Sequence, residues 1–197
     1  MLLYENRLSG NCYKVRLLFA LLGIAYDREQ LDVFDRSDRP GLIGDLNPAR
    51  RVPTLVLDNG RALAESGAIL YHFAQDTEYL PADGYERAQV LQWMFFEQYD
   101  IEPNIAVVRF WALGDISVSD DLREPRVEAG HRALAALQGH LGRHPFLVGE
   151  RYSIADIAVY GYVHVAHEGG FSLQAYPAVR AWLTRVAAHP GHVTIED

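Results

Sequence analysis

The chain is poor in the residues that build disulfides, basic surfaces and membrane spans. It has one cysteine in 197 residues, which excludes an internal disulfide and fits the reducing cytosol. Its 26 acidic residues outnumber 18 Lys and Arg, and the net charge of −8 argues against nucleic acid and anionic membranes as partners. No apolar run approaches the roughly 20 residues of a membrane span, and the first residues lack a secretory signal pattern. We therefore expect a cytoplasmic protein.

The order of strand and helix signals predicts two domains, with ample apolar content (49%) for their cores. Strand signals occur only near the N-terminus, at about 2–5, 27–32, 54–58 and 61–64, with helical patterns at about 12–23 and 66–76 and an irregular charged stretch at 35–47. After a linker at 78–84, the periodic segments are all helical, at about 85–113, 122–143, 154–167 and 178–189. Pro103 is expected to kink the first of these helices. The fold class is therefore α/β at 1–77 followed by an all-α domain at 85–197.

The segment around Pro53 carries the first candidate binding feature. Pro53 follows Val52 directly ahead of an apolar strand signal, and an X-Pro bond is the only common place for a cis peptide. We expect this bond to be cis. Because the residue before proline is pushed toward extended geometry, the amide and carbonyl of Val52 are predicted to pair with a bound peptide as an added strand would.

Glu65 and Ser66 carry the second feature. Ser66 stands just before a helical run and is predicted to be the N-cap residue of that helix. A helix start presents unpaired N–H groups and the positive end of the helix dipole, which suits a carboxylate. Glu65 beside it is placed to hold an ammonium group. Together the two features predict a receptor for a small zwitterionic peptide.

A third fragment lies at the N-terminus, where a short strand at 2–4 leads into Ser9-Gly10-Asn11-Cys12 and a helix. With these three fragments the chain resembles the glutathione S-transferases over essentially its whole length. The resemblance is closest to bacterial cytosolic members that carry Ser or Thr, and then Asn, at the head of the first helix. It implies a thioredoxin-like βαβαββα domain joined to a C-terminal helical bundle domain, glutathione as co-substrate, and a symmetric homodimer.

The resemblance also implies the residues of the site. Ser9, helped by Asn11, is expected to donate hydrogen bonds to the glutathione sulfur and to favour its thiolate, and which of the two dominates stays open. The expected glutathione-binding residues are Arg51, Val52, Pro53, Glu65 and Ser66, with Arg51 placed for the glycine carboxylate. Arg36 and Arg39 border the same site, and nothing in the sequence selects between them.

Several of these residues also have a simpler interpretation. Ser9 can serve as an N-cap alone, and Cys12 is expected to be a small buried residue, because Ser9 replaces the first cysteine of a CxxC redox motif. The segment 153–156 has capping-box spacing, so Asp156 is interpreted as structural. Lys14 is the only lysine and has no functional interpretation. The histidines show no metal-site spacing, so no metal is expected.

The sequence therefore favours an enzyme that activates the glutathione thiolate for attack on an electrophilic apolar substrate. The pocket for that second substrate is expected after the Pro103 kink, at Asn104, Arg109 and Phe110. Two alternatives stay open. One is a glutathione-dependent disulfide reductase or peroxidase that uses the same site, and the other is a non-catalytic binding module of the same fold.

Overall fold

The chain folds into two compact units. The computed structural model describes all 197 residues, and one unit comprises Met1–Gln75 with Pro190–Asp197 while the other comprises Asp76–His189. The first unit contains all the strands and the second is entirely helical. The predicted fold class, a thioredoxin-like domain followed by an all-helical domain, is confirmed.

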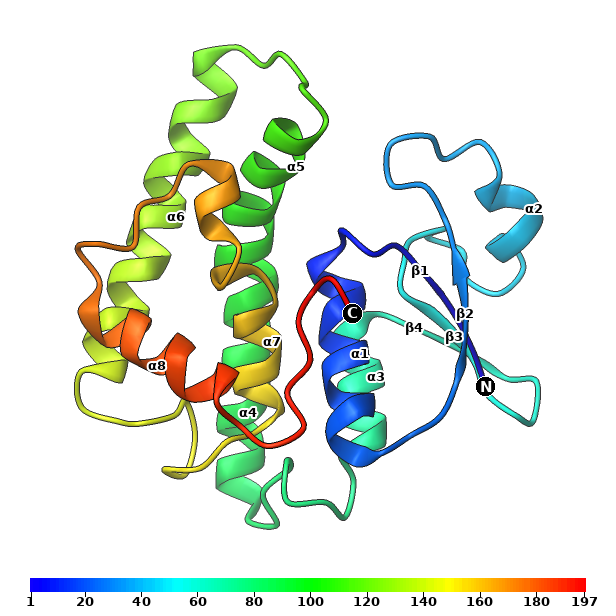
Figure 1. Cartoon of the computed structure of the whole chain (residues 1–197), viewed down its shortest axis with the longest axis horizontal. Coiled ribbons are helices and arrows are strands. Elements are labelled where there is room, and N and C mark those ends of the chain that lie inside the picture. Colours follow the sequence, from blue (N-terminus) through cyan, green and yellow to red (C-terminus); the bar gives the residue numbers. More distant parts are fainter. The chain divides into compact units, whose positions relative to one another are not determined.

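The first unit is a four-stranded mixed sheet with helices on its two faces (Figure 1). The strands are β1 (Leu2–Glu5), β2 (Asp27–Gln30), β3 (Thr54–Val56) and β4 (Ala62–Ala64), in the spatial order β2-β1-β3-β4. β1 pairs with β2 in parallel, as the crossover through a helix requires, and the other pairs are antiparallel. Helices α1 (Gly10–Leu22) and α3 (Ser66–Phe73) pack side by side on one face. A short helix α2 (Arg39–Ile43) lies in the stretch predicted to be irregular.

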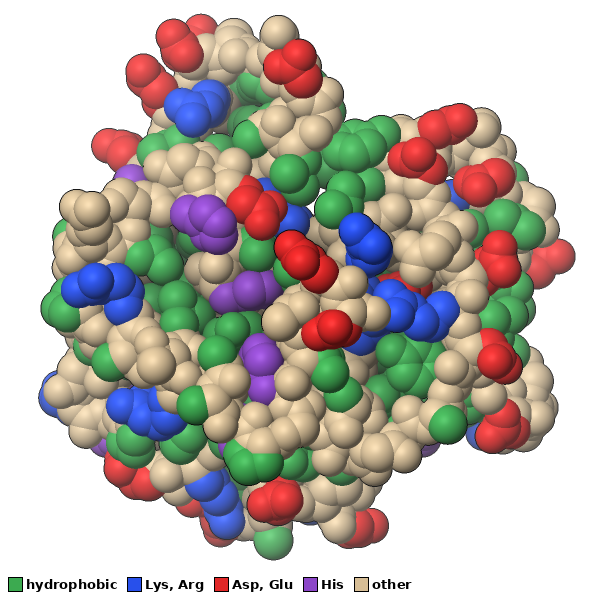
Figure 2. Space-filling model, in the orientation of Figure 1, with side chains coloured by type: hydrophobic (Ala, Val, Ile, Leu, Met, Phe, Trp, Pro, Cys, Tyr) green, Lys and Arg blue, Asp and Glu red, His purple; other side chains and the backbone are tan.

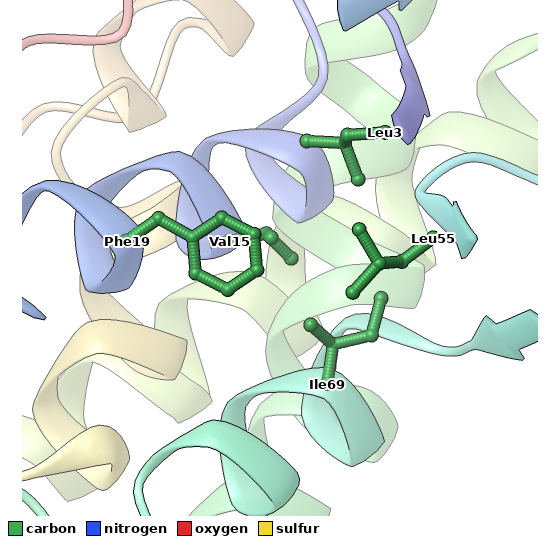
Figure 3. Close-up of a cluster of buried hydrophobic side chains, with 5 residues drawn as sticks. All are labelled: Leu3, Val15, Phe19, Leu55 and Ile69. Atoms are coloured by element: carbon green, nitrogen blue, oxygen red, sulfur yellow. The ribbon is translucent and has the colours of Figure 1, made fainter. Parts of the chain in front are cut away.

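A small apolar core fixes this sheet to its helices (Figure 3). It joins Leu3 of β1, Val15 and Phe19 of α1, Leu55 of β3 and Ile69 of α3, and all five side chains are fully buried. Burying each of them contributes about 1.5–3 kcal/mol. The core therefore fixes the relative positions of β1, β3, α1 and α3. It thereby also fixes the loops that connect to these elements.

The second unit is built around one long helical column. It runs through α4 (Gly84–Phe96), the π-helical segment η1 (Glu97–Ala106) and α5 (Val107–Leu113), and is followed by α6 (Asp120–Leu141), α7 (Ile154–Val163), η2 (Ala166–Gly169) and α8 (Pro177–Ala187). The disturbance predicted at Pro103 takes the form of the π-helical segment, which contains this proline. Helices α6 and α7 pack against η1, and α8 packs against both of them.

The last segment of the chain returns to the first unit, although the sequence analysis assigned it to the second domain. Tyr13 donates its hydroxyl to the carbonyl of Val193 at 2.8 Å, and Arg16 donates to the carbonyl of Ile195 at 2.7 Å. These bonds come from side chains of α1, so the helical periodicity used to place the domain boundary could not reveal them. The predicted linker likewise belongs to the second unit, where Tyr79 accepts a backbone hydrogen bond from Ile154.

Acidic side chains are spread over the face drawn in Figure 2, and basic side chains occur in small groups between them. None of the helices is both long enough and apolar enough to cross a lipid bilayer. No three His, Cys, Asp or Glu side chains lie close enough together to hold a metal ion.

Candidate functional site

The three fragments singled out from the sequence meet at one end of the sheet in the first unit. The register pairs Tyr4 of β1 with Thr54 of β3, and Thr54 with Ala64 of β4. Each fragment lies within a few residues of this row: the loop 6–9 after β1, Val52-Pro53 before β3, and Glu65-Ser66 after β4. Sheet pairing thus assembles segments that are far apart in the sequence into one candidate site.

The Val52-Pro53 bond is cis, as predicted. The carbonyl of Arg51 is fixed by two side chains, since Asn47 donates to it at 3.0 Å and Thr54 at 2.8 Å. Val52 is half-buried, and its own amide and carbonyl make no hydrogen bond within the chain because the ladder with β1 and β4 begins at Thr54. A residue next to a fixed carbonyl, with its own backbone amide and carbonyl unpaired, is suited to pairing with a peptide backbone.

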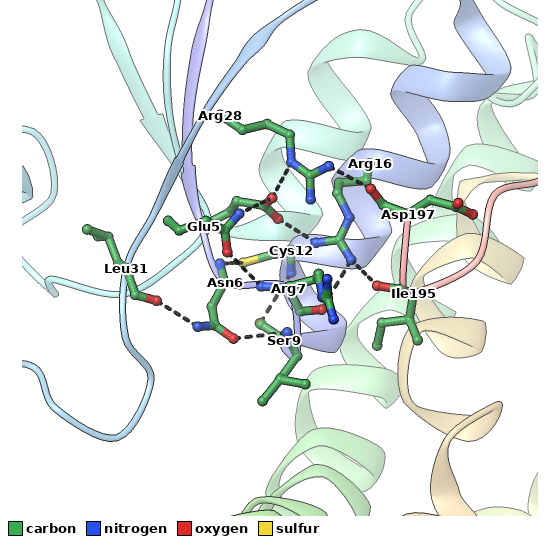
Figure 4. A network of polar contacts seen from close by, with 12 residues as sticks. Glu5, Asn6, Arg7, Ser9, Cys12, Arg16, Arg28, Leu31, Ile195 and Asp197 are labelled. Atoms are coloured by element: carbon green, nitrogen blue, oxygen red, sulfur yellow. Dashed lines mark hydrogen bonds and ion pairs between the residues drawn. The ribbon is translucent and has the colours of Figure 1, made fainter.

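Ser9 caps helix α1 through its hydroxyl oxygen, and its hydroxyl proton is not used by the cap (Figure 4). Its hydroxyl oxygen accepts from the amide of Cys12 at 3.3 Å, and its backbone is extended, as an N-cap requires. The cap uses only the oxygen lone pair. The hydroxyl proton faces no stronger acceptor than the Cys12 thiol, so it can still be donated to an anion.

Cys12 is fully buried and is not suited to act as a nucleophile. Its sulfur accepts from the amide of Asn6 at 3.4 Å. Burial raises the pKa of the Cys12 thiol to about 11, and the opposing effect of the Ser9 hydroxyl is smaller. The thiol is therefore protonated at neutral pH, whereas thiol chemistry requires the thiolate.

A buried ionic network supports the loop that leads to Ser9, and the sequence analysis missed it (Figure 4). Glu5 is fully buried and pairs with Arg16 and with Arg28, and it also accepts from Gln30 at 2.7 Å. Arg16 donates in turn to the carbonyl of Arg7 at 3.2 Å, inside the loop itself. The only signal in the sequence is that Glu5 shares the inward face of β1 with Leu3, where an apolar residue is expected.

The start of helix α3 differs in one respect from the prediction. Glu65, not Ser66, occupies the N-cap position, and its backbone is left-handed, with φ 69° and ψ 118°. A non-glycine residue in this conformation costs about 1–3 kcal/mol, and such residues concentrate at functional sites. The first intrahelical bond is donated by Ile69, so the N–H groups of residues 66–68 point out of the helix end unpaired. The exposed Glu65 carboxylate makes no ion pair. The site therefore offers unpaired N–H groups that can bind an anion, and a carboxylate that can bind a cation.

Asn11 joins the first helix to the third. The Ser66 hydroxyl donates to Asn11 Oδ1 at 3.3 Å, and the Lys14 ammonium donates to the same oxygen at 2.7 Å. Ser66 and Lys14 are both buried, with 5% and 1% of their surfaces exposed, while Asn11 is half-buried. The structure thus joins the predicted residues Asn11 and Ser66 in one polar cluster with Lys14, while the Ser9 side chain bonds separately to the Cys12 amide.

The arginines near this end of the sheet divide into two kinds. Arg51 is exposed and its side chain makes no hydrogen bond or ion pair, so its guanidinium is available to a ligand. Arg39 is buried and donates to the carbonyls of Arg50 and Asp32, at 3.0 and 2.7 Å, and burial lowers its pKa. Arg39 therefore holds the loop together, while Arg36 donates only to the nearby carbonyl of Val33.

The residues predicted for a second substrate all lie in the second unit. Asn104 donates to the carbonyl of Asp100 within its own helix, at 2.7 Å, and the buried Arg109 is ion-paired with Glu168, also at 2.7 Å. Phe110 is half-buried. A surface pocket of about 220 Å³ lies at the end of α5, and its lining includes Val108, Trp111, Ile116 and Arg123 but none of the three predicted residues.

Comparison with known proteins agrees with this geometry. Residues 8–76 match the family model described as "Glutathione S-transferase, N-terminal domain", and residues 120–185 match "Glutathione S-transferase, C-terminal domain". A crystal structure of a glutathione S-transferase from Pseudomonas fluorescens Pf-5 is 44% identical, with a TM-score of 0.94, over 100% of this chain and 98% of that one. A glutathione transferase family member from the same organism, solved with two glutathione bound, is 26% identical with a TM-score of 0.81, over 96% and 89% of the two chains.

A further relative differs in the activity that its name gives. "Disulfide-bond oxidoreductase YfcG" from Escherichia coli (strain K12) is 32% identical over 73% of this chain and 71% of its own length. The two domain models together span most of the chain in the expected order. The protein belongs to the glutathione S-transferase family.

Proposed function

We propose that this protein is a glutathione transferase that binds glutathione at the end of the sheet in its first unit. The peptide backbone of glutathione pairs with Val52, and its γ-glutamyl end lies at Glu65 and Ser66. Arg51 binds the glycine carboxylate. The observation that carries the proposal is that the unpaired backbone of Val52 lies at the same end of the sheet as the unpaired N–H groups that begin α3.

In this proposal Ser9 and Asn11 stabilise the thiolate. A free thiol of pKa about 8.5 is ionised to only a few per cent at pH 7, and a downward shift of about two units makes the thiolate the major form. Ser9 has a hydroxyl proton to donate, and the N-terminus of α1 adds a favourable dipole. The thiol proton is released to solvent. The sulfur then forms a bond to the electrophilic carbon while the leaving group departs with its electron pair.

A glutathione-dependent disulfide reductase is the second candidate. The name of the Escherichia coli relative favours it, and the same thiolate would attack a disulfide sulfur and expel the partner thiolate. Cys12 takes no part in either reaction, because it is buried and protonated. A turnover panel of aryl halides, epoxides, hydroperoxides and mixed disulfides separates the two candidates.

The active form in this proposal is a homodimer. Tyr85, Phe95 and Tyr99 of the α4–η1 column are 73%, 68% and 82% exposed. Phe95 and Tyr99 lie on neighbouring turns, and large aromatic side chains at such exposure are typical of a surface that a partner covers. Light scattering should give twice the mass of one chain, and Phe95→Glu with Tyr99→Glu should shift the protein toward monomer.

Calorimetry with glutathione tests the proposal as a whole. We expect binding in the micromolar to low-millimolar range, which corresponds to about 4–8 kcal/mol. Ser66→Ala should weaken binding, because a carboxylate loses a charge-assisted partner, whereas Ser172→Ala, an exposed site in the second unit, should not. If neither glutathione nor its disulfide binds, the enzyme proposal is wrong, and a non-catalytic module becomes the better description.

A further inference from the structure

The only lysine of the chain lies inside the candidate site rather than on the surface. Lys14 sits in the first turns of α1 with 1% of its surface exposed, and its ammonium donates to Asn11 Oδ1 at 2.7 Å. All the other basic side chains, apart from the histidines, are arginines. A buried ammonium carries a large desolvation cost, and its hydrogen bond to Asn11 is one of the interactions that offset this cost.

The contact determines which way the Asn11 amide faces. An ammonium has three donors and no acceptor, so it can bind only the oxygen of an amide and never the nitrogen. The Ser66 hydroxyl donates to the same oxygen at 3.3 Å. With two donors on Oδ1, the Nδ2 group turns away from Lys14 and Ser66, and it donates to no residue of the chain. Asn11 is only half-buried, so this donor is open to a ligand.

We propose that Lys14 is a positioning residue that locks the Asn11 amide with its N–H groups directed at the sulfur of bound glutathione. Without Lys14, the amide can rotate by half a turn and present its oxygen to the thiolate, which is repulsive. The shared oxygen also couples Asn11 to Ser66, so that the donor for the sulfur and the start of α3 are held as one unit. This inference rests on the proposed glutathione site and assigns a role to a residue within it.

The first test reads the Asn11 side chain directly and needs no glutathione. The side-chain amide signals of Asn11 in an NMR spectrum are identified by their absence in Asn11→Ala. Lys14→Met keeps the length of the side chain and removes its donors, so we expect the Asn11 signals to shift and broaden as the amide rotates. Lys14→Arg restores donors and should return a single sharp pair. Unchanged Asn11 signals in a folded Lys14→Met protein would overturn the proposal.

The second test measures the pKa of bound glutathione from its ultraviolet thiolate absorbance at saturating glutathione. We expect Lys14→Met to raise this pKa by about one unit, which lowers the thiolate fraction at pH 7 about threefold when the starting pKa is about two units below that of the free thiol. In an Asn11→Ala background the same substitution should have no further effect, because Lys14 acts through Asn11. Additive shifts in the double variant would contradict this, and would assign Lys14 a direct electrostatic effect instead.

Tyr13→Phe is the matched control. It removes a hydrogen bond of a buried side chain on the same helix, from Tyr13 to the carbonyl of Val193. It should lower the thermal stability of the protein without changing the pKa of bound glutathione or the Asn11 signals. If the wild-type protein binds no glutathione, the proposed function fails while the NMR test still decides the orientation of Asn11. If the Lys14→Met protein does not fold, Lys14→Gln replaces it in the NMR test. Its side chain has one neutral donor group, so the change in the Asn11 signals should be smaller than that expected for Lys14→Met. Asn11 signals identical to those of the wild type would overturn the proposal.

Discussion

Helices α1 and α7 both have a serine at the N-cap whose hydroxyl accepts a backbone hydrogen bond, and the two serines have different surroundings. Ser9 at the head of α1 and Ser153 at the head of α7 both accept a backbone N–H of the first turn, at 3.3 Å in each case. Ser153 is fully buried and also donates its hydroxyl to Asp156 Oδ2 at 3.2 Å. Ser9 is half-buried and has the neutral thiol of Cys12 where Ser153 has a carboxylate. One hydroxyl is fully used by the fold and the other is not.

The residue three positions after each serine makes the difference. Asp156 completes a capping box, accepting from Ser153 and also from the backbone of Leu147 and the indole of Trp182. Burial raises the pKa of Asp156 to about 6 against the effect of these donors, so the carboxylate is charged at neutral pH. In α1 no acid stands at this position, and an acid would have taken the Ser9 proton and repelled an anion. The absence of a carboxylate after Ser9 therefore favours a ligand site.

The largest effect on stability is expected from removing the Asp156 carboxylate from the capping box of α7. Asp156→Ala leaves the donors of Leu147, Ser153 and Trp182 without an acceptor in the core. At about 1–3 kcal/mol for each unsatisfied buried donor, the free energy of unfolding should fall by at least about 3 kcal/mol, measured by urea denaturation. Asp156→Asn keeps the shape and one acceptor, so its loss should be smaller. A loss of less than about 1 kcal/mol in the alanine variant would mean that the capping box is not needed.

Replacing each serine by alanine separates the two caps by function. Ser9→Ala should raise the pKa of bound glutathione by a unit or more and lower the rate at neutral pH about tenfold, less if Asn11 compensates. Ser153→Ala should leave both unchanged for each folded molecule. Either variant loses a cap and about 1 kcal/mol of stability. Equal effects of the two substitutions on the bound thiol would refute the distinction between the caps.

Local patterns in the sequence predict what depends on neighbouring residues. The cis bond before Pro53 and the capping box ahead of α7 follow from a few adjacent residues, and both are present. The general fold follows from the order of periodic segments, which determines the β-rich and helical halves. The roles assigned to Ser9, Asn11 and the glutathione-binding residues rest on the same kind of pattern and stay predictions.

What the sequence could not predict depends on contacts between distant residues. The pairing of Glu5 with Arg16, and the return of the chain end to α1, join positions that no periodicity connects. The same holds for Asn11, whose side-chain oxygen accepts from Lys14 of its own helix and from Ser66 of another helix. Glu65 instead of Ser66 is the N-cap because the chain reverses out of β4 through a left-handed residue, a conformation that its side chain does not favour.

The smallest effect at neutral pH is expected from replacing Cys12, which stands three residues after Ser9, where α7 has Asp156. Cys12→Ala should leave glutathione binding and turnover unchanged and cost only packing stability. Its signature is the pH dependence of that cost. In the unfolded chain the thiol ionises at its ordinary pKa near 9, while burial raises the folded pKa to about 11.

Between these two values the unfolded state releases a proton that the folded state retains, so the wild-type protein loses stability as pH rises above 9. The loss should reach about 1.4 kcal/mol at pH 10. Cys12→Ala has no such thiol, so the stability difference between the two proteins, measured by urea denaturation at pH 8 and pH 10, should shrink by that amount. A constant difference would show that the Cys12 thiol is not desolvated. A loss of turnover in Cys12→Ala would instead show that this cysteine takes part in the reaction, and Ser9 would then not be the main catalytic group.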